Sequence, residues 1–373
     1  MRIGFDGRSL VSPAGGVRRY ASELLDGLVR SNPNDTIVVF GASADSAQQL
    51  AVQHRSVRQI APTNLGWSLV DLPRAIRNEG LDVFHAPAYT APLYGAHPLA
   101  LTIHDVSYER HPEWYPYRRD PFRRWFYRCS ARTADVIITD SDFSRREIAA
   151  AYGLDLSLIR VVPLGVGGRF LASTPPRRPT DVKQPYVLHV GDLHVRRNVQ
   201  TLVRALARLP SVYSQIAPPL LVLAGADRGE RANIEIEAQR TNVQIRFSGP
   251  VDDDALVALY ARAAVFVYPS RYEGFGLPLL EAMACGTPVI GARAGAIPEV
   301  VGDAGILVDP DDESEMAASI GRVMSDTELA ARLRSAGRKR AMGYSWARTA
   351  RQTTEAYGEA IDRVAKGGRR TSR

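Results

Sequence analysis

Residues 268–290 read YPSRYEGFGLPLLEAMACGTPVI, and this order of residue types predicts a strand, a glycine-rich loop and a helix. The strand ends at the first tyrosine, and Pro278 suits the first turn of the helix. Such a loop presents backbone N–H groups beside a helix N-terminus, which favours anionic or hydroxyl-rich ligands. Glu273 in the loop and Glu281 in the first helical turns are therefore candidate binding residues. The alternative is an ordinary strand, turn and helix in which Glu281 only favours the helix start.

The alternation of strand and helix extends from this stretch over the whole chain. Short runs of β-branched and aliphatic residues recur with helical patterns between them, as in parallel sheets buried on both faces. In the first half the runs are 3–6, 37–40, 83–86, 101–104, 136–139 and 160–163. In the second half they are 186–190, 220–224, 244–248, 265–268, 288–291 and 305–308. Each half is therefore expected to form its own α/β, doubly wound, Rossmann-like domain.

The length of 373 residues suits two to three domains of about 150 residues each. Residues 170–185 contain four prolines and interrupt the pattern, so we expect them to form a linker. The first domain is then expected over 1–169 and the second over 186–343. A helix over 344–365 is expected to pack back on the first domain, and 366–373 to form a basic tail.

Composition excludes several classes of protein. The 45% apolar and 23% charged residues are typical of globular chains rather than disordered ones. The net charge is +7, but five positive residues lie among the last eleven, so the rest carries only about +2 and does not favour nucleic-acid binding. Cys129 and Cys285 are too few for a disulfide framework or a thiolate zinc site, which indicates a reducing compartment.

The sequence also bears on the location of the protein. It has no apolar run of the roughly 18 to 20 residues that cross a bilayer. The first residues turn polar too early for a secretory signal. We therefore expect a cytoplasmic protein, with peripheral contact at the inner face of the membrane as a further possibility that depends on residues 117–132.

Residues 117–132 combine six arginines and five aromatic residues with a single acid. A basic, aromatic helix of this kind can lie on an anionic membrane surface. It can also pack its aromatic rings inward while the arginines point to water. We expect the inward packing and keep peripheral membrane contact as the alternative.

Two helix starts can be predicted from capping patterns. Ser144 and Glu147 have the spacing of a capping box, so a helix is expected to begin near Ser144. Three acids at 252–254 precede another apolar helical pattern. They could suggest a metal site, but they also suit the positive end of a helix dipole. We expect a helix cap there and no metal site.

The segment 268–290 resembles the E-x7-E signature of family 4 glycosyltransferases, a retaining family with the GT-B fold. The match includes the Pro-Ser before the loop, both glutamates at the right spacing, and the Ala-x-Ala-x-Gly-x-Pro-Val-Ile that follows. The resemblance extends from the GGVRRY at 15–20 to the YSW at 344–346. It implies two Rossmann-like domains facing each other across a cleft, with the nucleotide-sugar donor mainly on the second domain and the acceptor on the first.

The resemblance implies that Glu273 orients the donor sugar and that Glu281 holds the ribose. Other donor-binding residues implied in the same stretch are Gly274, Phe275, Gly276 and Leu277. Val251, which follows a strand and a glycine, is implied to lie against the nucleotide base through its backbone. The alternative for Val251 is a simple strand-ending turn.

Residues 189–198 read HVGDLHVRRN and follow the first strand of the second domain. Arg196 and Arg197 could supply fixed positive charge where a departing diphosphate develops negative charge, with Gly191 beside the donor. In the family the second basic residue is usually lysine. At Arg197 this sequence therefore has a planar guanidinium with several N–H donors in place of a compact ammonium group. The alternative is a solvated pair on a loop. We expect Arg197→Ala to change thermal stability little, as exposed substitutions do.

In the first domain, the resemblance places Gly15 and Gly16 against the donor phosphates and the acceptor, where a missing side chain allows close approach. A flexible loop is the alternative. His104 is expected to end a strand and, by resemblance, to face the donor sugar; a buried structural histidine is the alternative.

We therefore predict a retaining glycosyltransferase that moves a hexose from a nucleotide diphosphate sugar to a glycan or lipid-linked acceptor. The opening GFDGR and GGVRRY most resemble bacterial mannosyltransferases of polysaccharide assembly, which favours GDP-mannose. A dTDP-rhamnose or UDP-glucose donor, or a non-catalytic nucleotide-sugar-binding protein, are alternatives. A nicotinamide-dependent oxidoreductase is disfavoured because no G-x-G-x-x-G turn follows the first strand. No cofactor and no metal ion are expected, since arginines can balance the diphosphate.

Overall fold

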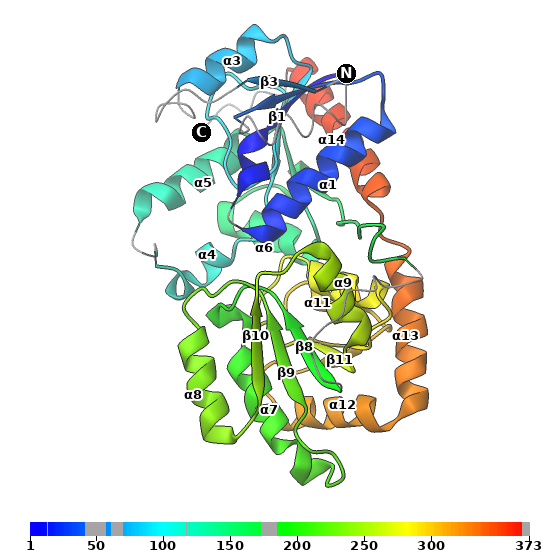
Figure 1. The fold of residues 1–373 in the computed structure, drawn as a ribbon. Coiled ribbons are helices and arrows are strands. Elements are labelled where there is room, and N and C mark those ends of the chain that lie inside the picture. Colours follow the sequence, from blue (N-terminus) through cyan, green and yellow to red (C-terminus); the bar gives the residue numbers. More distant parts are fainter. Residues whose placement is uncertain are drawn as a thin grey trace. The chain divides into compact units, whose positions relative to one another are not determined.

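The computed structural model describes residues 1–12, 14–41, 57–60, 70–116, 118, 120–172 and 185–367, with 57–60 described by their backbone alone. The chain divides into two compact units (Figure 1). Met1–Gly165 and Ser345–Arg373 form the first unit, and Val166–Tyr344 form the second. Most of the expected linker, and the basic tail beyond residue 367, lie outside the described residues.

The first unit contains a seven-stranded sheet whose neighbouring strands all run parallel, in the order β3-β2-β1-β4-β5-β6-β7. Its strands are β1 (Arg2–Asp6), β2 (Thr36–Phe40), β3 (Val57–Ile60), β4 (Val83–Ala86), β5 (Leu99–Thr102), β6 (Val136–Thr139) and β7 (Ile159–Val161). Its α-helices are α1 (Gly15–Ser31), α3 (Leu72–Asn78), α4 (Ser107–Arg110), α5 (Pro121–Thr133), α6 (Asp142–Tyr152) and α14 (Trp346–Ala365). Three short 3-10 helices are η1 (Gly7–Val11), η3 (Pro112–Trp114) and η4 (Leu156–Leu158).

The second unit contains a six-stranded parallel sheet in the order β10-β9-β8-β11-β12-β13. Its strands are β8 (Tyr186–Val190), β9 (Leu220–Ala224), β10 (Ile245–Gly249), β11 (Val265–Tyr268), β12 (Val289–Ala292) and β13 (Ile306–Val308). Its helices are η5 (Val195–Arg197), α7 (Val199–Val212), α8 (Arg231–Thr241), α9 (Asp253–Arg262), α10 (Leu277–Ala284), α11 (Ile297–Val301), α12 (Glu313–Ser325) and α13 (Thr327–Ala341).

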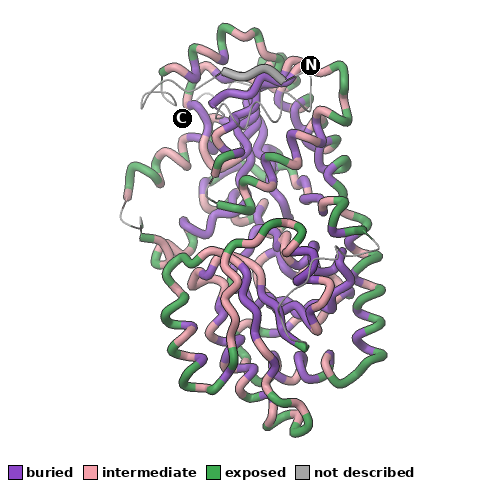
Figure 2. The backbone as a smooth tube through the Cα atoms, in the orientation of Figure 1, coloured by how far each residue is buried: buried purple, intermediate pink, exposed green. Residues whose placement is uncertain are grey.

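Both sheets are doubly wound, which decides where polar side chains can gather. In each unit the chain builds the sheet outward in one direction and then in the other. The direction changes between β1 and β4 in the first unit and between β8 and β11 in the second. Figure 2 shows that buried backbone is concentrated in the strands, as the near-continuous apolar runs predicted. Ligands of open α/β sheets bind beyond the carboxyl ends of the strands at such switch points.

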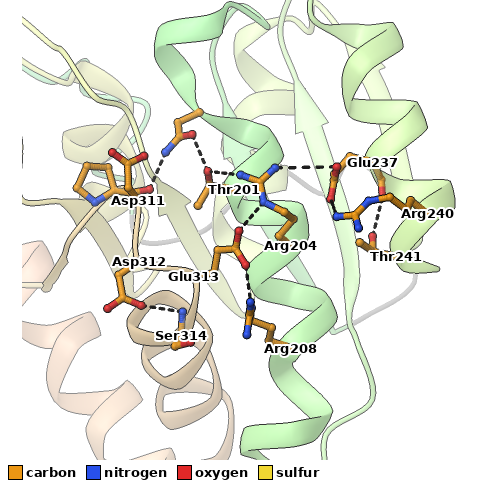
Figure 3. Close-up of polar contacts among 12 residues, drawn as sticks. Thr201, Arg204, Arg208, Glu237, Arg240, Thr241, Asp311, Asp312, Glu313 and Ser314 are labelled. Atoms are coloured by element: carbon orange, nitrogen blue, oxygen red, sulfur yellow. Dashed lines mark hydrogen bonds and ion pairs between the residues drawn. The ribbon is translucent and has the colours of Figure 1, made fainter.

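Ion pairs connect the helices on one side of the second sheet (Figure 3). Arg204 of α7 contacts the Glu313 carboxylate of α12 at 2.5 Å and lies 4.0 Å from Glu237 of α8. Arg208, one turn further along α7, contacts the other oxygen of Glu313 at 2.7 Å. Two arginines on successive turns of α7 therefore share one acid of α12.

The C-terminal helix α14 packs against α1 of the first unit. The two helices approach closely at Gly27, where an added Cβ would lie 3.1 Å from the Cβ of Ala350. Tyr357 of α14 reaches the sheet and contacts His85 Nδ1 at 2.7 Å through its hydroxyl. Both side chains are fully buried, so α14 completes the core of the first unit.

The structure corrects three sequence predictions in the first unit. The helix expected near Ser144 begins at Asp142, because Ser141 is the residue whose hydroxyl caps it. The strand expected at 101–104 is β5, which ends at Thr102, two residues before His104. The edge strand β3 was missed.

The prediction for α5 was also wrong in part. Phe122 and Trp125 are 64% and 51% exposed, whereas Ser130 and Ala131 are buried. The helix contacts β5 and α6, and its small residues are the buried ones. Of the expected segment 117–132, residues 117 and 119 lie outside the described residues.

Candidate functional site

The centre of the candidate site lies at the switch point of the second sheet, where β8 and β11 end. The segment after β8 carries Arg196 and Arg197 in the 3-10 helix η5, whose first N–H groups face the side chain of His194. The segment after β11 carries Glu273. A backbone hydrogen bond from Arg271 N to Arg196 O, 2.9 Å long, joins the two segments. The fold therefore brings together residues that are separated by more than 70 positions in the sequence.

Arg197 and Glu273 form an ion pair across this point, with only 13% and 7% of their side chains exposed. The Arg197 guanidinium also donates to the Tyr268 hydroxyl, and the Ser270 hydroxyl donates to Glu273 Oε1 at 2.6 Å. Arg197 Nε–H is buried and has no partner. The alternative of a solvated loop residue is wrong for Arg197, because it is held in a buried polar cluster, and the expectation that Arg197→Ala changes thermal stability little loses its basis with it.

Burial favours the neutral form of the Tyr268 hydroxyl in this cluster and raises its pKa well above the ordinary value of 10.0. The hydroxyl is therefore a hydrogen-bond donor or acceptor at any working pH. Together with Ser270 it fixes the position of the ion pair.

Glycines allow the backbone segments to approach each other around the ion pair. Gly225, with φ +153°, lies so close to the end of β8 that an added Cβ would sit 2.0 Å from the Gly191 carbonyl oxygen. Gly191 itself has φ +145°, and the Arg197 guanidinium lies beside the position that its Cβ would take. Gly295, with φ +59°, allows the Ala296 N–H to donate to the Glu273 carbonyl at 3.0 Å. The positions of both Arg197 and Glu273 therefore depend on residues without side chains.

The loop after Glu273 leads into α10 as predicted. Gly276 precedes the helix with φ +105°, and Pro278 is in its first turn. Phe275 is buried with its ring 6.0 Å from that of Tyr344, which anchors the loop, while Leu277 is half-buried at the first helical position. Gly274 is buried within the loop. No side chain caps α10, so its positive end faces the loop.

Glu281 lies in the second turn of α10 and is 3% exposed. Its Oε2 accepts a hydrogen bond from the Tyr260 hydroxyl of α9 at 3.1 Å. A buried carboxylate with a hydroxyl partner of this kind is held in one orientation. Val251 lies two residues beyond the end of β10 and is half-buried.

His104 lies beyond β5 in the first unit and is 9% exposed. Its Nδ1 contacts Oδ2 of Asp140, which follows β6, at 2.8 Å. Nε2 of His104 and Oδ1 of Asp140 are both buried without a partner. The Tyr20 ring meets the imidazole edge-on, with ring centroids 4.6 Å apart.

Asp140 determines the charge state of His104. Burial alone would lower the pKa of His104, but the Asp140 carboxylate outweighs burial and raises the pKa above its ordinary value of 6.5. Asp105 acts in the same direction as Asp140 but has another task, because it accepts from Ser107 N and Oγ at the start of α4. The imidazole is therefore oriented by Asp140, and the Pro87 backbone carbonyl also favours its charged form.

Gly15 and Gly16 form the first turn of α1, and an added Cβ at either glycine would meet no atom within 4 Å. No side chain caps this helix. Both glycines belong to the first unit together with His104, whereas the other candidate residues belong to the second.

Asp252 caps α9 as predicted, since its Oδ1 accepts from Ala255 N at 2.8 Å. Asp253 forms an ion pair with Arg169 at 2.9 Å. Among the residues that the structure describes, no three His, Cys, Asp or Glu side chains gather closely enough to hold a metal ion.

The residues at the site that were not predicted from the sequence include Tyr260, Tyr268, Ser270, Gly225, Gly295 and Asp140. Asp140 is the one that a sequence signal could have identified. It follows the strand adjacent to the strand before His104, and parallel strands present their carboxyl ends at one edge.

Two doubly wound parallel sheets, each with polar groups beyond the carboxyl ends of its strands, define a two-unit α/β protein of the GT-B type. The fold matches that of sucrose-phosphate synthase from Thermosynechococcus elongatus, with a TM-score of 0.75 and 23% identity over 97% of this chain and 99% of that one. It also matches Anabaena HepE in complex with UDP and glucose, with a TM-score of 0.73 and 22% identity over 96% and 99% of the two chains.

The chain belongs to the glycosyltransferases: residues 14–167 match the family described as Glycosyltransferase Family 4, and residues 173–340 match Glycosyl transferases group 1. It is 30% identical to O-antigen chain mannosyltransferase B of Escherichia coli, over 96% of this chain and 99% of that protein. It is 33% identical to the MMP alpha-(1->4)-mannosyltransferase of Mycolicibacterium hassiacum, over 72% of this chain and 67% of that protein. The predicted family and fold class are thereby confirmed, and the protein is a glycosyltransferase.

None of the helices in the described part of the chain is both long enough and apolar enough to cross a membrane.

Proposed function

We propose that this glycosyltransferase transfers mannose from GDP-mannose, with retention of the anomeric configuration, to a glycan or lipid-linked acceptor. Two relatives that match most of this chain are named mannosyltransferases, and one of them is named for the O-antigen chain. That likeness supports both mannose as the sugar and a polysaccharide-type acceptor. The donor itself is the co-substrate, and the proposed reaction uses no other cofactor.

The Arg197–Glu273 pair at the switch point is the observation that carries the proposal. Breaking the bond between sugar and diphosphate places negative charge on the leaving group, and a fixed cation there lowers the barrier. Arg197 and the adjacent Arg196 would supply that charge, and Arg197 Nε–H still lacks an acceptor. Glu273, held by Ser270, would accept hydrogen bonds from hydroxyls of the sugar.

The remaining residues of the second unit would hold the nucleotide. Glu281 would accept hydrogen bonds from the ribose hydroxyls while Tyr260 keeps its carboxylate in place. The loop from Gly274 to Leu277 would offer backbone N–H groups to the diphosphate at the positive end of α10. Gly191 and Val251 would border the donor through their backbones.

The first unit would supply the acceptor side of the reaction. His104 Nε2, without a partner of its own, would face a hydroxyl of the donor sugar, with Asp140 holding the ring. Gly15 and Gly16 would permit a phosphate or acceptor group to approach the positive end of α1, since an added Cβ at either position would meet none of the described atoms within 4 Å.

Transfer can be tested with a panel of donors. The purified enzyme is incubated with a mannose-terminated acceptor and GDP-mannose, UDP-glucose or dTDP-rhamnose in turn. We expect product from GDP-mannose only, with an α-linkage by NMR, which corresponds to retention. Faster transfer from UDP-glucose or dTDP-rhamnose would show that mannose is not the sugar transferred. A product linkage of inverted anomeric configuration would contradict a retaining mechanism.

A matched variant shows whether the product depends on the proposed site. Glu273→Gln keeps the size of the side chain and removes its charge, so it should lower turnover about a hundredfold or more. Full turnover by this variant would remove Glu273 from the mechanism. Binding of GDP-mannose without transfer to any acceptor would instead support a non-catalytic binding protein.

A further inference from the structure

Helix α5 presents its largest apolar side chains to solvent. Trp125, Phe126 and Cys129 lie three, four and seven residues after Phe122, which places the four residues on one face of the helix. The ring centroids of Phe122 and Trp125 lie 5.6 Å apart, and those of Phe122 and Phe126 lie 6.3 Å apart. We call these four residues the aromatic stripe. It is continuous over about two turns of the helix.

The orientation of α5 is the reverse of an ordinary amphipathic helix. Its buried residues are the small Ser130 and Ala131, and of its aromatic residues Tyr127 is the one that joins an internal ring cluster, with Tyr108 at 4.6 Å. Phe122 and Trp125 therefore keep more than half of their surface in solvent. Large exposed aromatic groups gathered in one place usually mark a contact surface.

Positive charge surrounds the aromatic stripe. The exposed residues on and before α5 include Arg118, Arg123, Arg128 and Arg132. The acids nearby are already engaged, because Glu109 pairs with Arg124 at 2.6 Å and Asp120 caps the helix and faces Arg123. Arg128 and Arg132 lie one turn apart on the same side of the stripe, by their spacing of four residues. The surface therefore combines apolar rings with a cationic border.

We propose that α5 is a membrane-binding helix that lies on an anionic lipid surface, with the aromatic stripe inserted among the headgroups and the arginines contacting lipid phosphates. Exposed Trp and Phe side chains bordered by arginines are typical of helices that lie in the interface plane. Because arginines surround the aromatic stripe, an anionic lipid surface fits it better than a neutral apolar partner would. The enzyme would then bind a lipid-linked acceptor at the membrane surface on which α5 lies.

The experiment is sedimentation of the full-length enzyme with vesicles of phosphatidylcholine alone or with added phosphatidylglycerol. We expect binding to the anionic vesicles that weakens when salt rises from about 0.1 M to about 1 M. The double variant Phe122→Ser/Trp125→Ser should bind at least about tenfold more weakly. Arg128→Glu should weaken binding about fivefold or more.

Ile236→Ser is the matched control, because Ile236 of α8 is 63% exposed and lies outside the stripe. It should bind vesicles like the unchanged enzyme. Thermal unfolding of each variant checks that the fold is kept, as expected for exposed positions. Quenching of Trp125 fluorescence by brominated lipids provides a second measurement, and Trp125→Phe should remove that quenching.

Two results would overturn the proposal. One is equal vesicle binding by the enzyme and the Phe122→Ser/Trp125→Ser variant. The other is a stripe variant that changes the oligomeric state by sedimentation velocity while neither protein binds anionic vesicles, which would assign the stripe to a contact between copies of the chain. Neither measurement needs donor or acceptor, so the result is independent of which sugar is transferred.

Discussion

The Arg197 guanidinium lies against the Glu273 carboxylate, with both side chains largely buried. Removing one partner leaves the other as an uncompensated buried charge, which typically costs about 3 to 5 kcal/mol of stability. Substitutions at this pair therefore change the fold and the chemistry together. The first prediction has to separate these two effects.

We expect Arg197→Lys to lower turnover less than about tenfold, because lysine keeps the charge but not the planar fork. Arg197→Ala should lower turnover by about a hundred- to a thousandfold, the usual effect of losing one fixed donor to developing charge. It should also lower the melting temperature, since Glu273 loses its partner. Steady-state kinetics and thermal unfolding measure the two effects. Wild-type turnover in the alanine variant would place the leaving group elsewhere.

Glu281→Gln should weaken the binding of GDP by about tenfold or more, because hydrogen bonds to a charged group contribute about 1.5 to 3 kcal/mol. Glutamine keeps an oxygen for the Tyr260 hydroxyl, so the fold is preserved better than with alanine. Tyr260→Phe is the comparison: it removes the hydroxyl that orients the carboxylate but leaves the charge, so its affinity for GDP should fall less than that of Glu281→Gln. Isothermal titration calorimetry gives both constants. Equal affinities of Glu281→Gln and the unchanged enzyme would contradict the ribose role.

Asp140→Asn should make the stability of the first unit depend differently on pH. Asp140 raises the pKa of His104 above 6.5, so the pair stabilises the fold fully below pH 6.5, and this contribution is lost as pH rises through the folded pKa. The variant should therefore lose more stability at about pH 6 than at about pH 9. The nearby groups Asp105, His85 and Tyr20 are unchanged by the substitution.

Urea unfolding at the two pH values measures this difference. The control is the same substitution in a His104→Gln background, where the pH dependence should disappear. The alkaline limb of the pH–rate profile should also move to lower pH in Asp140→Asn, since burial then lowers the pKa of His104 against only the smaller effects of Asp105 and the Pro87 backbone. An equal loss of stability at both pH values would show that Asp140 stabilises the fold by packing and hydrogen bonding and not by its charge.

At the scale of the element, the acids 252–254 illustrate how one pattern supports two interpretations. Asp252 satisfies an N–H of the first turn of α9, and Asp253 is paired with Arg169. We therefore expect the same turnover in excess EDTA as with magnesium, because arginines and not a metal ion would balance the diphosphate. Asp252→Ala should lower the stability of the second unit by about 1 kcal/mol. Activity that EDTA abolishes and a divalent ion restores would contradict a metal-independent reaction.

Strands were the most predictable elements, because a strand buried on both faces has to be apolar throughout. The bounds predicted for β4, β6, β8, β9 and β11 agree with the structure. Helix starts were less predictable: Ser141 and Ser144 are both suitable caps, and the choice depends on Ser144 Oγ donating to the His104 carbonyl, a contact between distant residues.

The candidate site was also predictable only in part from the sequence. Glu273 and Arg197 were identifiable from loops after strands, but their mutual pairing was not, because it follows from the strand order β8-β11. The orientation of α5 was also unpredictable, since its composition suits either face. The structure decides it by placing Ser130 and Ala131 against the sheet side.

At the scale of the whole molecule, the chain leaves the first unit after Gly165 and returns to it at Ser345. Each unit has a hydrophobic cluster of its own, so each can unfold as a separate cooperative step. The helix α14 belongs by its contacts to the first unit although it follows the second in sequence.

We expect two unfolding transitions, and we expect GDP to raise only the one that belongs to the second unit. A ligand at about 100 times its Kd adds about 2.7 kcal/mol to the unit that binds it. Tyr357→Phe should lower the other transition, because His85 Nδ1 loses its buried partner, at a cost of about 1 to 3 kcal/mol. Tyr186→Phe is the matched control: its buried hydroxyl donates to the Leu259 carbonyl within the second unit, so it should lower the transition that GDP raises. If Tyr357→Phe instead lowered the GDP-sensitive transition, α14 would be coupled energetically to the donor-binding unit, and the assignment of that helix to the first unit would fail.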